Sequence, residues 1–467
     1  MIYHNLYERS AVQTVTAAII GTGHFSTALI AQAKKHPRLR VAALADRDAA
    51  ALEKAMSQAE ILPGEYALCD TAAGAERALR AGKIVCATQA RLLFELPISI
   101  FVECTGNPEA GALHAVSALE AGRHVVMVNK ETDSCVGPIL RAMAEKKNLI
   151  YTPVDGDQHG ALMQLVEWAR DNGVEVISAG KSRDAEFIYD KKAGTITVYS
   201  DGGITIPKTI TASLEDSGRR YFEELPESRK AEYLERRRDI LKALNPRGGF
   251  DLCEMVIAAN ATGLAPAVSL LNDYILRTPE IPKVLCGAAG GGLLAGEGVV
   301  DVITNLHEPC EAGLGGGVFV VVRAENSYSR HILATKGCLS NKDGTAALVY
   351  RPYHLCGVEA PTTLLCAGLL GVGTGSRRYR QDYDIVQEAA VDLRAGEVMG
   401  GDHDTRLLTH IVPASPLAEG GPVPAHLLNG RALSCDVKKG TMITCKMIDR
   451  PEDSLLWNLR EKQDDIK

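Results

Sequence analysis

A cluster of acidic and imidazole side chains near residue 157 is the first group in this sequence that could do chemistry. The run Asp155-Gly156-Asp157-Gln158-His159-Gly160 holds two carboxylates and a histidine within six residues. Such a group could form a proton relay, bind a metal or build a well-bonded turn, and its glycines would let the backbone wrap closely around a ligand. Asp157 is the functional candidate, with His159 beside it. No spacing of Asp, Glu and His is diagnostic of a metal, so no metal ligands are predicted and a metal requirement stays open.

A second charged cluster is the run Lys181-Ser182-Arg183-Asp184, at the end of an expected strand over residues 174–180. On an extended chain Lys181 and Arg183 point the same way, which suits a phosphate or a carboxylate. Asp184 could hold Lys181 in place or transfer protons with it. The alternative is a surface charge cluster.

Three buried strands are expected to position the residues on the N-terminal side of this cluster. Apolar runs at 101–103, 124–128 and 149–154 end at Thr105-Gly106, at Asn129-Lys130 and at the acidic cluster. In an open parallel sheet, ligands bind beyond the carboxyl ends of the strands, where these polar groups fall. A lysine solvated at a strand end is the alternative for Lys130, but its place at the carboxyl edge of the sheet favours a function.

A glycine turn after the first apolar strand predicts a dinucleotide site. Residues 15–20 form the strand, a helix is expected over 27–35, and the next strand, 40–45, leads to an acid. Glycines let the backbone approach a pyrophosphate, the helix N-terminus stabilises its charge, and an acid about 20 residues further on binds the ribose hydroxyls. Ser26 replaces the third glycine of the usual pattern, and a tight turn in any βαβ unit is the alternative. The cofactor residues predicted here are Gly21, Gly23, His24, Phe25, Asp46 and Arg47.

Two neighbouring residues favour different cofactors. A carboxylate at Asp46 repels a 2′-phosphate and favours NAD, whereas Arg47 could clamp that phosphate. The residues alone do not decide whether NAD or NADP is the cofactor.

The composition excludes several classes of protein. With 46% hydrophobic and 23% charged residues the chain is ordinary globular protein, and its 467 residues allow two or three domains of about 100–200 residues each. A net charge of -7 and a pI near 6.0 argue against a nucleic-acid partner. No apolar run is long enough for a bilayer, and the first residues lack the pattern of a signal peptide. The 12 scattered cysteines are typical of reduced thiols in a cytoplasmic protein.

Other segments predict how the chain is arranged and whether it forms an oligomer. The charged, helix-prone stretch 222–244 is predicted to form an exposed arm, and a helix over 361–370 to pack back on the nucleotide-binding part. The glycines between residues 279 and 300 lack the lysine-serine ending of a phosphate loop, so they predict close-packed backbone or a lid. Together with the arm, this apolar middle predicts a homo-oligomer, either a dimer or a tetramer.

Several motifs together resemble one family of oxidoreductases. Residues 103–111, 118–126 and Asn129-Lys130 are similar to the nucleotide domain of homoserine dehydrogenases. Further motifs are Arg351-Pro352-Tyr353-His354-Leu355 and the segments 389–397, 423–430 and 437–444, which suggest short strands. With these the chain resembles the 1-deoxy-D-xylulose 5-phosphate reductoisomerase-like (DRL-like) oxidoreductases, which join a homoserine-dehydrogenase-like body to a C-terminal SAF module. The resemblance runs from Val15 to about Asp449.

The resemblance implies an α/β protein with a Rossmann-type parallel sheet, an α+β catalytic domain and a small C-terminal β-rich SAF module. The expected domains are 1–155 for NAD(P) binding, 156–384 for catalysis and oligomerisation, and 385–467 for the SAF-like part. It also implies an NAD(P) cofactor, with NADPH slightly favoured, and leaves a divalent metal open.

The resemblance also implies roles for individual residues. Thr105 and Gly106 would border the nicotinamide, and Asn129 would belong to the cofactor site. Lys130 and Lys181 would stabilise substrate oxygens, while Asp157 and Asp184 would move protons. The residues expected to bind the substrate are Arg183, His159, Arg351 and His354.

Three functions follow as hypotheses. The first is an NAD(P)-dependent oxidoreductase of a small phosphorylated or polyhydroxylated carbonyl compound, with reductoisomerisation of 1-deoxy-D-xylulose 5-phosphate to 2-C-methyl-D-erythritol 4-phosphate as one case. The second is dehydrogenation of a sugar acid or polyol without rearrangement. The third, from another class, is a non-catalytic sugar-binding or assembly protein.

Overall fold

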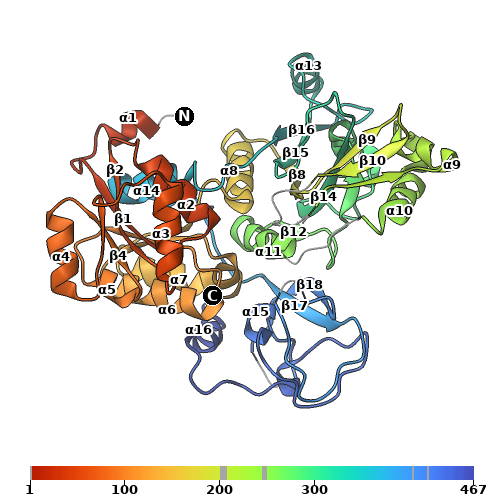
Figure 1. Cartoon of the computed structure of the whole chain (residues 1–467). Helices are drawn as coiled ribbons and strands as arrows, with labels where there is room; N and C mark the ends of the chain where they lie inside the picture. The colour runs from red at the N-terminus through yellow and green to blue at the C-terminus, as the bar shows by residue number, and fades with distance from the viewer. Residues whose placement is uncertain (1–2, 200–207, 245–249, 402–403, 418–419, 467) are drawn as a thin grey trace. The chain divides into compact units, whose positions relative to one another are not determined.

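The computed structural model describes residues 3–199, 208–244, 250–401, 404–417 and 420–466 (Figure 1). Its backbone divides into two compact units. Unit 1 comprises Met1–Gly160, Leu355–Leu408 and Ala414–Lys467, and unit 2 comprises Ala161–His354 and Thr409–Pro413. The proposed domains 1–155, 156–384 and 385–467 follow changes in sequence pattern along the chain, whereas the two units follow contacts in space.

Unit 1 is built on a seven-stranded parallel sheet in the order β3-β4-β2-β1-β5-β6-β7. Its strands are β1 (Val15–Ile20), β2 (Leu39–Ala45), β3 (Tyr66–Leu68), β4 (Ile84–Ala87), β5 (Ile100–Glu103), β6 (His124–Met127) and β7 (Tyr151–Pro153). The strand order reverses at β1, which pairs with β2 on one side and β5 on the other. The predicted Rossmann-type sheet is confirmed, and the general rule places its ligand crevice at this reversal.

Helices cover both faces of the sheet (Figure 1). On one face lie α2 (His24–Ala33), α3 (Ala49–Gln58) and α14 (Ala360–Leu365). On the other lie α4 (Ala72–Arg80), α5 (Arg91–Phe94), α6 (Pro108–Glu120) and α7 (Lys130–Lys146). Because both faces are covered, strands such as β1 read as continuous apolar runs. The predicted packing of residues 361–370 on this part is confirmed, since Leu364 and Leu365 share a core with β1, although α14 continues as a π-helical turn, Cys366–Leu370.

The first helix begins earlier than the sequence predicted. α2 starts at His24 and not at Thr27, directly after Gly23, whose backbone is extended with φ -79° and ψ -159°. The hydroxyls of Ser26 and Thr27 donate to the carbonyl of Gly23 at 3.0 and 2.8 Å, which fixes this first turn. His24 and Phe25 therefore lie at a helix N-terminus, where backbone N–H groups without helical partners suit a pyrophosphate.

The C-terminal part of unit 1 is rich in short β segments. β17 (Tyr383–Ala389) lies in this part, β18 (Leu407–Pro413) begins in it, and isolated bridges such as Glu388 to Met442 connect further segments. α16 (Leu455–Gln463) packs against α6 and α7: the Ser454 hydroxyl donates to Glu109 at 2.6 Å, and the Gln463 amide oxygen accepts from the backbone N–H of Ile139 at 2.9 Å. The small β-rich C-terminal part is as predicted, and its assignment as a SAF module stays a proposal.

Unit 2 contains a nine-stranded mixed sheet. Its strands are β8 (Val176–Ser182), β9 (Phe187–Asp190), β10 (Thr195–Val198), β11 (Ile210–Ser213), β12 (Ala265–Pro266), β13 (Tyr274–Leu276), β14 (Val299–His307), β15 (Val318–Arg323) and β16 (Ala346–Arg351). β8 is central, because it pairs in parallel with β14 and antiparallel with β15, and all its residues are buried. The mixture of parallel and antiparallel pairs agrees with the predicted α+β character.

The central strand extends further than predicted. β8 runs to Ser182 and not to Gly180, so Lys181 is a residue within the strand and pairs with β14 and β15. Gly180 is required here, because a Cβ would lie 2.4 Å from the carbonyl oxygen of Asp301 and 2.6 Å from the ring of Phe319. The extension is stable because neighbouring strands complete the hydrogen bonds of the backbone on both sides.

The prediction that residues 222–244 form an exposed arm is wrong. The main helix of this segment is α10 (Lys230–Leu241), and one of its faces is buried, with Arg237 fully covered. The Arg237 guanidinium donates to Glu280 at 2.6 and 2.9 Å and to the carbonyl oxygens of Tyr221 and Ile275. Its many donors are therefore paired, which makes the burial of this charge tolerable.

Asp301 on β14 is a fully buried acid that makes the stability of unit 2 depend on pH. Burial raises the pKa of Asp301 to about 6, although hydrogen bonds from Asn272 and from the N–H of Val302 act to lower it. Because the folded pKa is raised, its favourable contribution is complete below about pH 4 and is lost as the pH rises through 6, at a cost of about 3 kcal/mol.

We therefore expect Asp301→Asn to gain stability relative to the wild type as the pH rises from about 4 to 7.5. Thermal unfolding of both proteins at the two pH values measures this gap. Asp239→Asn, at an exposed position on α10, is the control and should show a constant gap. A constant gap for Asp301→Asn as well would contradict the prediction.

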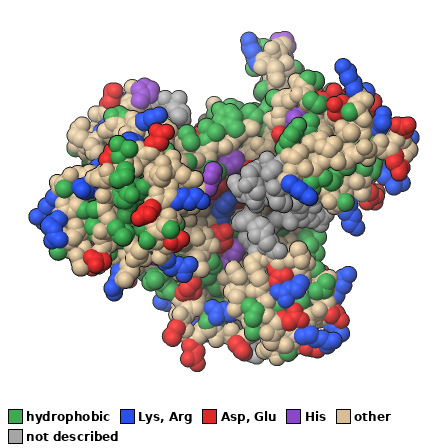
Figure 2. Space-filling model, viewed as in Figure 1, with side chains coloured by type: hydrophobic (Ala, Val, Ile, Leu, Met, Phe, Trp, Pro, Cys, Tyr) green, Lys and Arg blue, Asp and Glu red, His purple; other side chains and the backbone are tan. Residues whose placement is uncertain are grey.

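On the face drawn in Figure 2, acidic and basic side chains of the described residues are interspersed. None of the 12 cysteines, all of which lie among the described residues, forms a disulfide. Among the described residues, no helix has both the length and the apolar character needed to cross a membrane.

Candidate functional site

A cavity of about 550 Å³ lies in unit 1 where the strand order reverses. Five of the predicted cofactor residues line it, namely Gly21, Gly23, Asp46, Arg47 and Thr105. The other four, His24, Phe25, Gly106 and Asn129, do not belong to its lining. New members that the sequence did not single out are Thr22, Asn107 and His114.

Gly21 closes the base of this cavity. Its φ is +91°, and a Cβ would lie 2.7 Å from the carbonyl oxygen of Cys104, at the end of β5. Its N–H donates to the carbonyl of Ala45 at 2.8 Å, which ties the end of β1 to β2. Only glycine permits this close approach of three strand ends.

Asp46 stands at the end of β2 and contacts the glycine turn. Its carboxylate accepts from the N–H and the hydroxyl of Thr22, both at 2.8 Å, and from the N–H of Asp48 at 3.0 Å. Burial acts to raise the pKa of Asp46, but these hydrogen bonds outweigh it and hold the pKa below its ordinary value. The acid is therefore ionised at neutral pH, as ribose binding requires. The glycine turn, the helix N-terminus and this acid fit a dinucleotide.

A buried network supports the other wall of the cavity. Glu103 is 2% exposed, and it accepts from the Thr105 hydroxyl at 2.7 Å and lies 3.1 Å from Nδ1 of His114. The Asn129 amide donates to the Thr105 hydroxyl at 3.3 Å and to the carbonyl of Asn107 at 3.0 Å, while its oxygen caps α7. Asn129 thus holds the Thr-Gly turn in shape. Glu103 was not predicted as a site residue, because in the sequence it is the last residue of an apolar strand.

Arg47 allows a test of cofactor preference. It is exposed and lines the cavity next to Asp46. If it binds the 2′-phosphate of NADPH, Arg47→Ala should raise the KM for NADPH by about 10- to 100-fold and change that for NADH little, because a charge-assisted contact is lost. Initial rates with both cofactors measure this. Arg80→Ala, which removes an exposed ion pair to Glu76 on α4, is the control, and equal effects on both cofactors would contradict the assignment.

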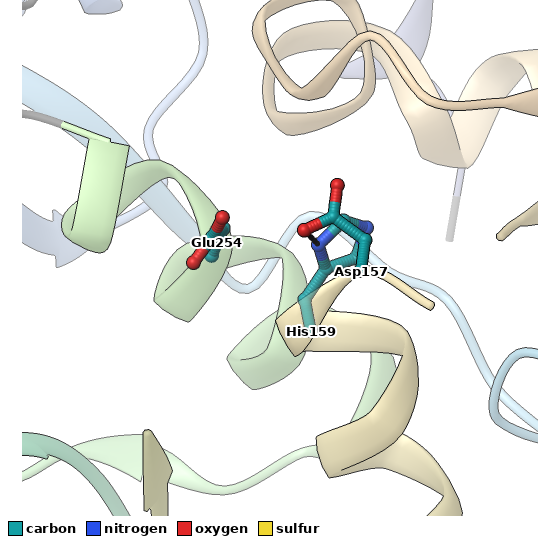
Figure 3. A group of neighbouring side chains, drawn as sticks. All are labelled: Asp157, His159 and Glu254. Carbon is teal, nitrogen blue, oxygen red and sulfur yellow. Dashed lines mark ion pairs between the residues drawn. The ribbon is translucent and has the colours of Figure 1, made fainter. Parts of the chain in front are cut away.

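Lys130 and Asp157 meet beyond the carboxyl ends of β6 and β7. Lys130 is the first residue of α7, is about one quarter exposed, and has its Nζ 3.5 Å from Oδ1 of Asp157. Asp157 is buried and precedes α8 (Gln158–Asp171), whose first N–H donates to it at 2.8 Å. Nδ1 of His159 lies 3.8 Å from the same oxygen (Figure 3). The sequence prediction that these strand-end residues come together is met for Lys130, Asp157 and His159.

Unit 2 holds a buried cluster around Lys181 and Arg183. Lys181 pairs with Asp251 at 2.9 Å and, more closely, with Glu254; both acids lie on α11 (Phe250–Thr262). Arg183 pairs with Asp251 at 3.3 Å and Asp273 at 3.1 Å. Burial acts to lower the pKa of Arg183, but the two carboxylates outweigh it and raise the pKa. The surface charge cluster considered as an alternative is excluded, since Lys181 and Arg183 are 2% and 7% exposed.

The acids of this cluster were not predicted from the sequence. Asp251 and Glu254 are three residues apart and so lie on one face of α11, a spacing that was visible in an otherwise apolar helix. Glu254, which Figure 3 also labels, is 2% exposed. Asp273 had no comparable signal, because it follows a turn and meets Arg183 only through the fold.

The last three predicted residues lie at the edge of unit 2. Nδ1 of His354 is 2.7 Å from the carbonyl oxygen of Gly316 and 3.9 Å from Asp184. The Asp184 side chain is 46% exposed, yet partial burial raises its pKa against the opposing charges of Lys181 and His354. The Arg351 guanidinium stacks 4.7 Å from the ring centre of Tyr353. Asp184 and His354 therefore come together, whereas Arg351 contacts the ring of Tyr353, two residues further along the chain.

Comparison with known proteins bears on both units. Residues 20–153 match the NAD-binding domain of homoserine dehydrogenase, and residues 248–360 match the catalytic domain of the oxidoreductase DRL. The 1-deoxy-D-xylulose 5-phosphate reductoisomerase of Leptospira biflexa serovar Patoc is 35% identical over 68 residues, which are 15% of this chain and 17% of that protein. That of Leptospira interrogans is 29% identical over 141 residues, 29% of this chain and 30% of that protein. The chain thus spans less than a third of the length of these curated relatives.

A solved structure is also similar in part. The Zymomonas mobilis 1-deoxy-D-xylulose 5-phosphate reductoisomerase in complex with NADPH is 20% identical, over 37% of this chain and 45% of that one, with a TM-score of 0.27. The first family match contains the cavity and Lys130, and the second contains Asp251, Glu254, Asp273 and His354. The chain therefore resembles the oxidoreductase DRL over residues 248–360 and has a nucleotide-binding domain of the homoserine dehydrogenase type, with NAD(P) as its cofactor.

Proposed function

We propose that this chain reduces a small phosphorylated or polyhydroxylated carbonyl compound with NAD(P)H. The observation that carries the proposal is the ion pair of Lys130 with Asp157 at 3.5 Å, on the same sheet whose reversal point fits the dinucleotide. A lysine with a buried acid partner, beside a cofactor crevice, is the arrangement that carbonyl reduction needs. The names of the partly similar relatives make 1-deoxy-D-xylulose 5-phosphate the first substrate to test.

The proposed chemistry assigns separate tasks to Lys130 and Asp157. When bound, NAD(P)H supplies the hydride that reduces a carbonyl carbon. Lys130 donates a proton to the oxygen that becomes an alcohol, and Asp157 takes part in restoring that proton to the amine. For 1-deoxy-D-xylulose 5-phosphate, one C–C bond must first break and another form, and reduction of the resulting aldehyde then gives 2-C-methyl-D-erythritol 4-phosphate.

Further roles are proposed for residues of unit 2 and for His159. Lys181 stabilises a developing oxyanion, Asp184 exchanges protons, and Arg351 and His354 bind the anionic end of the substrate. Arg183 is already paired with Asp251 and Asp273, so its proposed part is to hold these acids in place rather than to carry the full charge of the substrate. His159 belongs to the same proposal through its contact with Asp157.

The deciding experiment follows NAD(P)H absorbance while the purified protein is offered 1-deoxy-D-xylulose 5-phosphate, with and without a divalent metal. Cofactor oxidation that Lys130→Ala abolishes is the expected result. No oxidation, but thermal protection by the cofactor, would reject this substrate and direct the search to dehydrogenation of sugar acids and polyols. If the protein shows neither cofactor oxidation nor thermal protection by the cofactor, the enzyme proposal is overturned. A non-catalytic sugar-binding or assembly protein is then favoured.

The proposal includes a homo-oligomer. Size-exclusion chromatography with light scattering is expected to give a mass of at least twice 50.0 kDa. A monomer would remove this part of the proposal and leave the reaction untouched.

A further inference from the structure

A second cavity of unit 1, of about 350 Å³, lies at the amino ends of β2 and β4. These two strands are neighbours in the parallel sheet, and the residues after their carboxyl ends line the cofactor cavity. Because β2 has 7 residues, the two cavities are separated by about 20 Å along the sheet. They have no lining residue in common, so the second cavity takes no part in the proposed reaction.

Backbone hydrogen bonds connect the loops that form the walls of this second cavity. The N–H of Ile84, the first residue of β4, donates to the carbonyl of Glu65 at 2.8 Å, and the N–H of Lys83 donates to the carbonyl of Ala78 at 3.0 Å. Gly82 turns the chain between α4 and β4 with a φ of +79°, which glycine adopts without strain. The hollow is therefore fixed by the backbone, so it does not depend on the rotamers of surface side chains.

Two basic side chains of the lining have no acidic partner among the described residues. Nη2 of Arg40 on β2 is buried and makes no hydrogen bond with the described residues, and Lys83 forms no ion pair with them. Lys34 differs, because its Nζ donates to the carbonyl of Glu60 at 2.6 Å and lies 3.8 Å from Glu65, the acid of the lining. A buried guanidinium N–H without a partner costs stability, and an anion in the cavity would remove that cost.

His36 offers a neutral donor to the same cavity. Its Nδ1 accepts from the N–H of Arg38 at 3.2 Å, so the proton of the neutral ring is at Nε2. Burial, and after it the positive charge of Arg38, lowers the pKa of His36, which keeps the ring neutral at physiological pH. Arg40, Lys83 and His36 together give the cavity two cations and one neutral N–H donor.

Apolar side chains form much of the remaining lining. Ile30, Leu39, Val41 and Ile61 are buried and border the cavity. Its volume is at the lower end of the range of about 300–1,000 Å³ that small-molecule sites occupy. The lining thus suits a small molecule that has both an anionic group and a hydrocarbon part.

We propose that this cavity binds a small phosphate monoester with a short apolar body. At neutral pH such a phosphate carries about 1.5 to 2 negative charges, which match the two cations Arg40 and Lys83. Its oxygens accept hydrogen bonds from both and from His36. A carboxylate has one charge and would leave one of the two cations unmatched. This inference is independent of the proposed function.

The test is a calorimetric titration of n-butyl phosphate into the full-length protein saturated with NADPH, so that the dinucleotide site is occupied. The wild type is expected to bind the ester with a Kd of about 1 mM or lower. Arg40→Met and Lys83→Met should each raise this Kd by about 10-fold or more, because a charge-assisted hydrogen bond is lost.

Lys35→Met is the matched control. Lys35 is exposed at the same end of α2 and does not line the cavity, so its loss removes one positive charge nearby and should change the Kd by less than about 2-fold. Inorganic phosphate and butyrate are the comparison ligands. Each should bind about 10-fold or more weakly than the ester, the first for want of the apolar body and the second for want of the second charge.

Thermal unfolding without added anion provides a second readout. Arg40→Met should unfold at the wild-type temperature or above it, because it removes a buried donor without a partner and keeps an apolar stem. A clearly lower temperature would show that Arg40 stabilises the free protein and would overturn its assignment to a ligand. The proposal is also overturned if the wild type does not bind the ester, if both variants bind it as the wild type does, if Lys35→Met weakens it equally, or if inorganic phosphate or butyrate binds as tightly.

Discussion

Lys130→Met is expected to lower kcat by about 10³-fold and to leave cofactor binding unchanged. The substitution removes the donor that faces the substrate oxygen in the proposed reaction. Lys130 is the first residue of α7 and its side chain is about one quarter exposed, so an apolar side chain of similar length fits without strain. The cofactor cavity is lined by other residues, so NAD(P)H fluorescence titration should give an unchanged Kd.

Two variants control this prediction. Lys146→Met changes an exposed lysine in the last turn of the same helix and should keep full activity. Asp157→Asn should lower kcat as well, because it removes the group that pairs with Lys130. A Lys130→Met protein that binds NAD(P)H and retains more than about a tenth of the wild-type kcat would exclude Lys130 from proton transfer.

Lys181→Met is expected to destabilise the protein by about 3–5 kcal/mol and to abolish activity. The substitution leaves Asp251 and Glu254 buried, with one cation fewer between them. Breaking a buried ion pair by removing one partner is costly, because the remaining carboxylates stay out of water with less opposing charge beside them. The midpoint of urea unfolding, followed by circular dichroism, measures the loss.

A double variant separates stability from catalysis. Lys181→Met with Glu254→Gln removes both charges of the closer pair and should recover much of the lost stability, but not the activity. Lys191→Met removes the exposed ion pair with Glu223 and is expected to leave the unfolding midpoint unchanged. If the double variant regains turnover as it regains stability, Lys181 is a structural residue and not part of the proposed site.

The sequence determined the nucleotide-binding sheet of this protein. Apolar runs, glycine turns and helix caps such as Asp48 and Asn129 act over a few residues, so β1, β2 and β5 occur within one or two residues of their predicted bounds. The rule that ligands bind at the carboxyl ends of parallel strands then placed Gly21, Asp46 and Thr105 around one cavity. The start of α2 was missed because the extended Gly23 lets the helix begin at once.

Only the tertiary structure decided which charges are buried and how they are paired. Arg237 reads as one more basic residue of a charged helix, yet Glu280 and three backbone carbonyls enclose it. Lys181 could be singled out from its spacing with Arg183, but its acidic partners come from α11, about 70 residues further along the chain. The burial of Asp133 on α7 was not predicted either, because its hydrogen-bond partner Tyr151 lies 18 residues further along the chain. Local patterns fix secondary structure because backbone preferences are short-ranged, whereas a buried charge is stable only with partners that the fold brings from elsewhere.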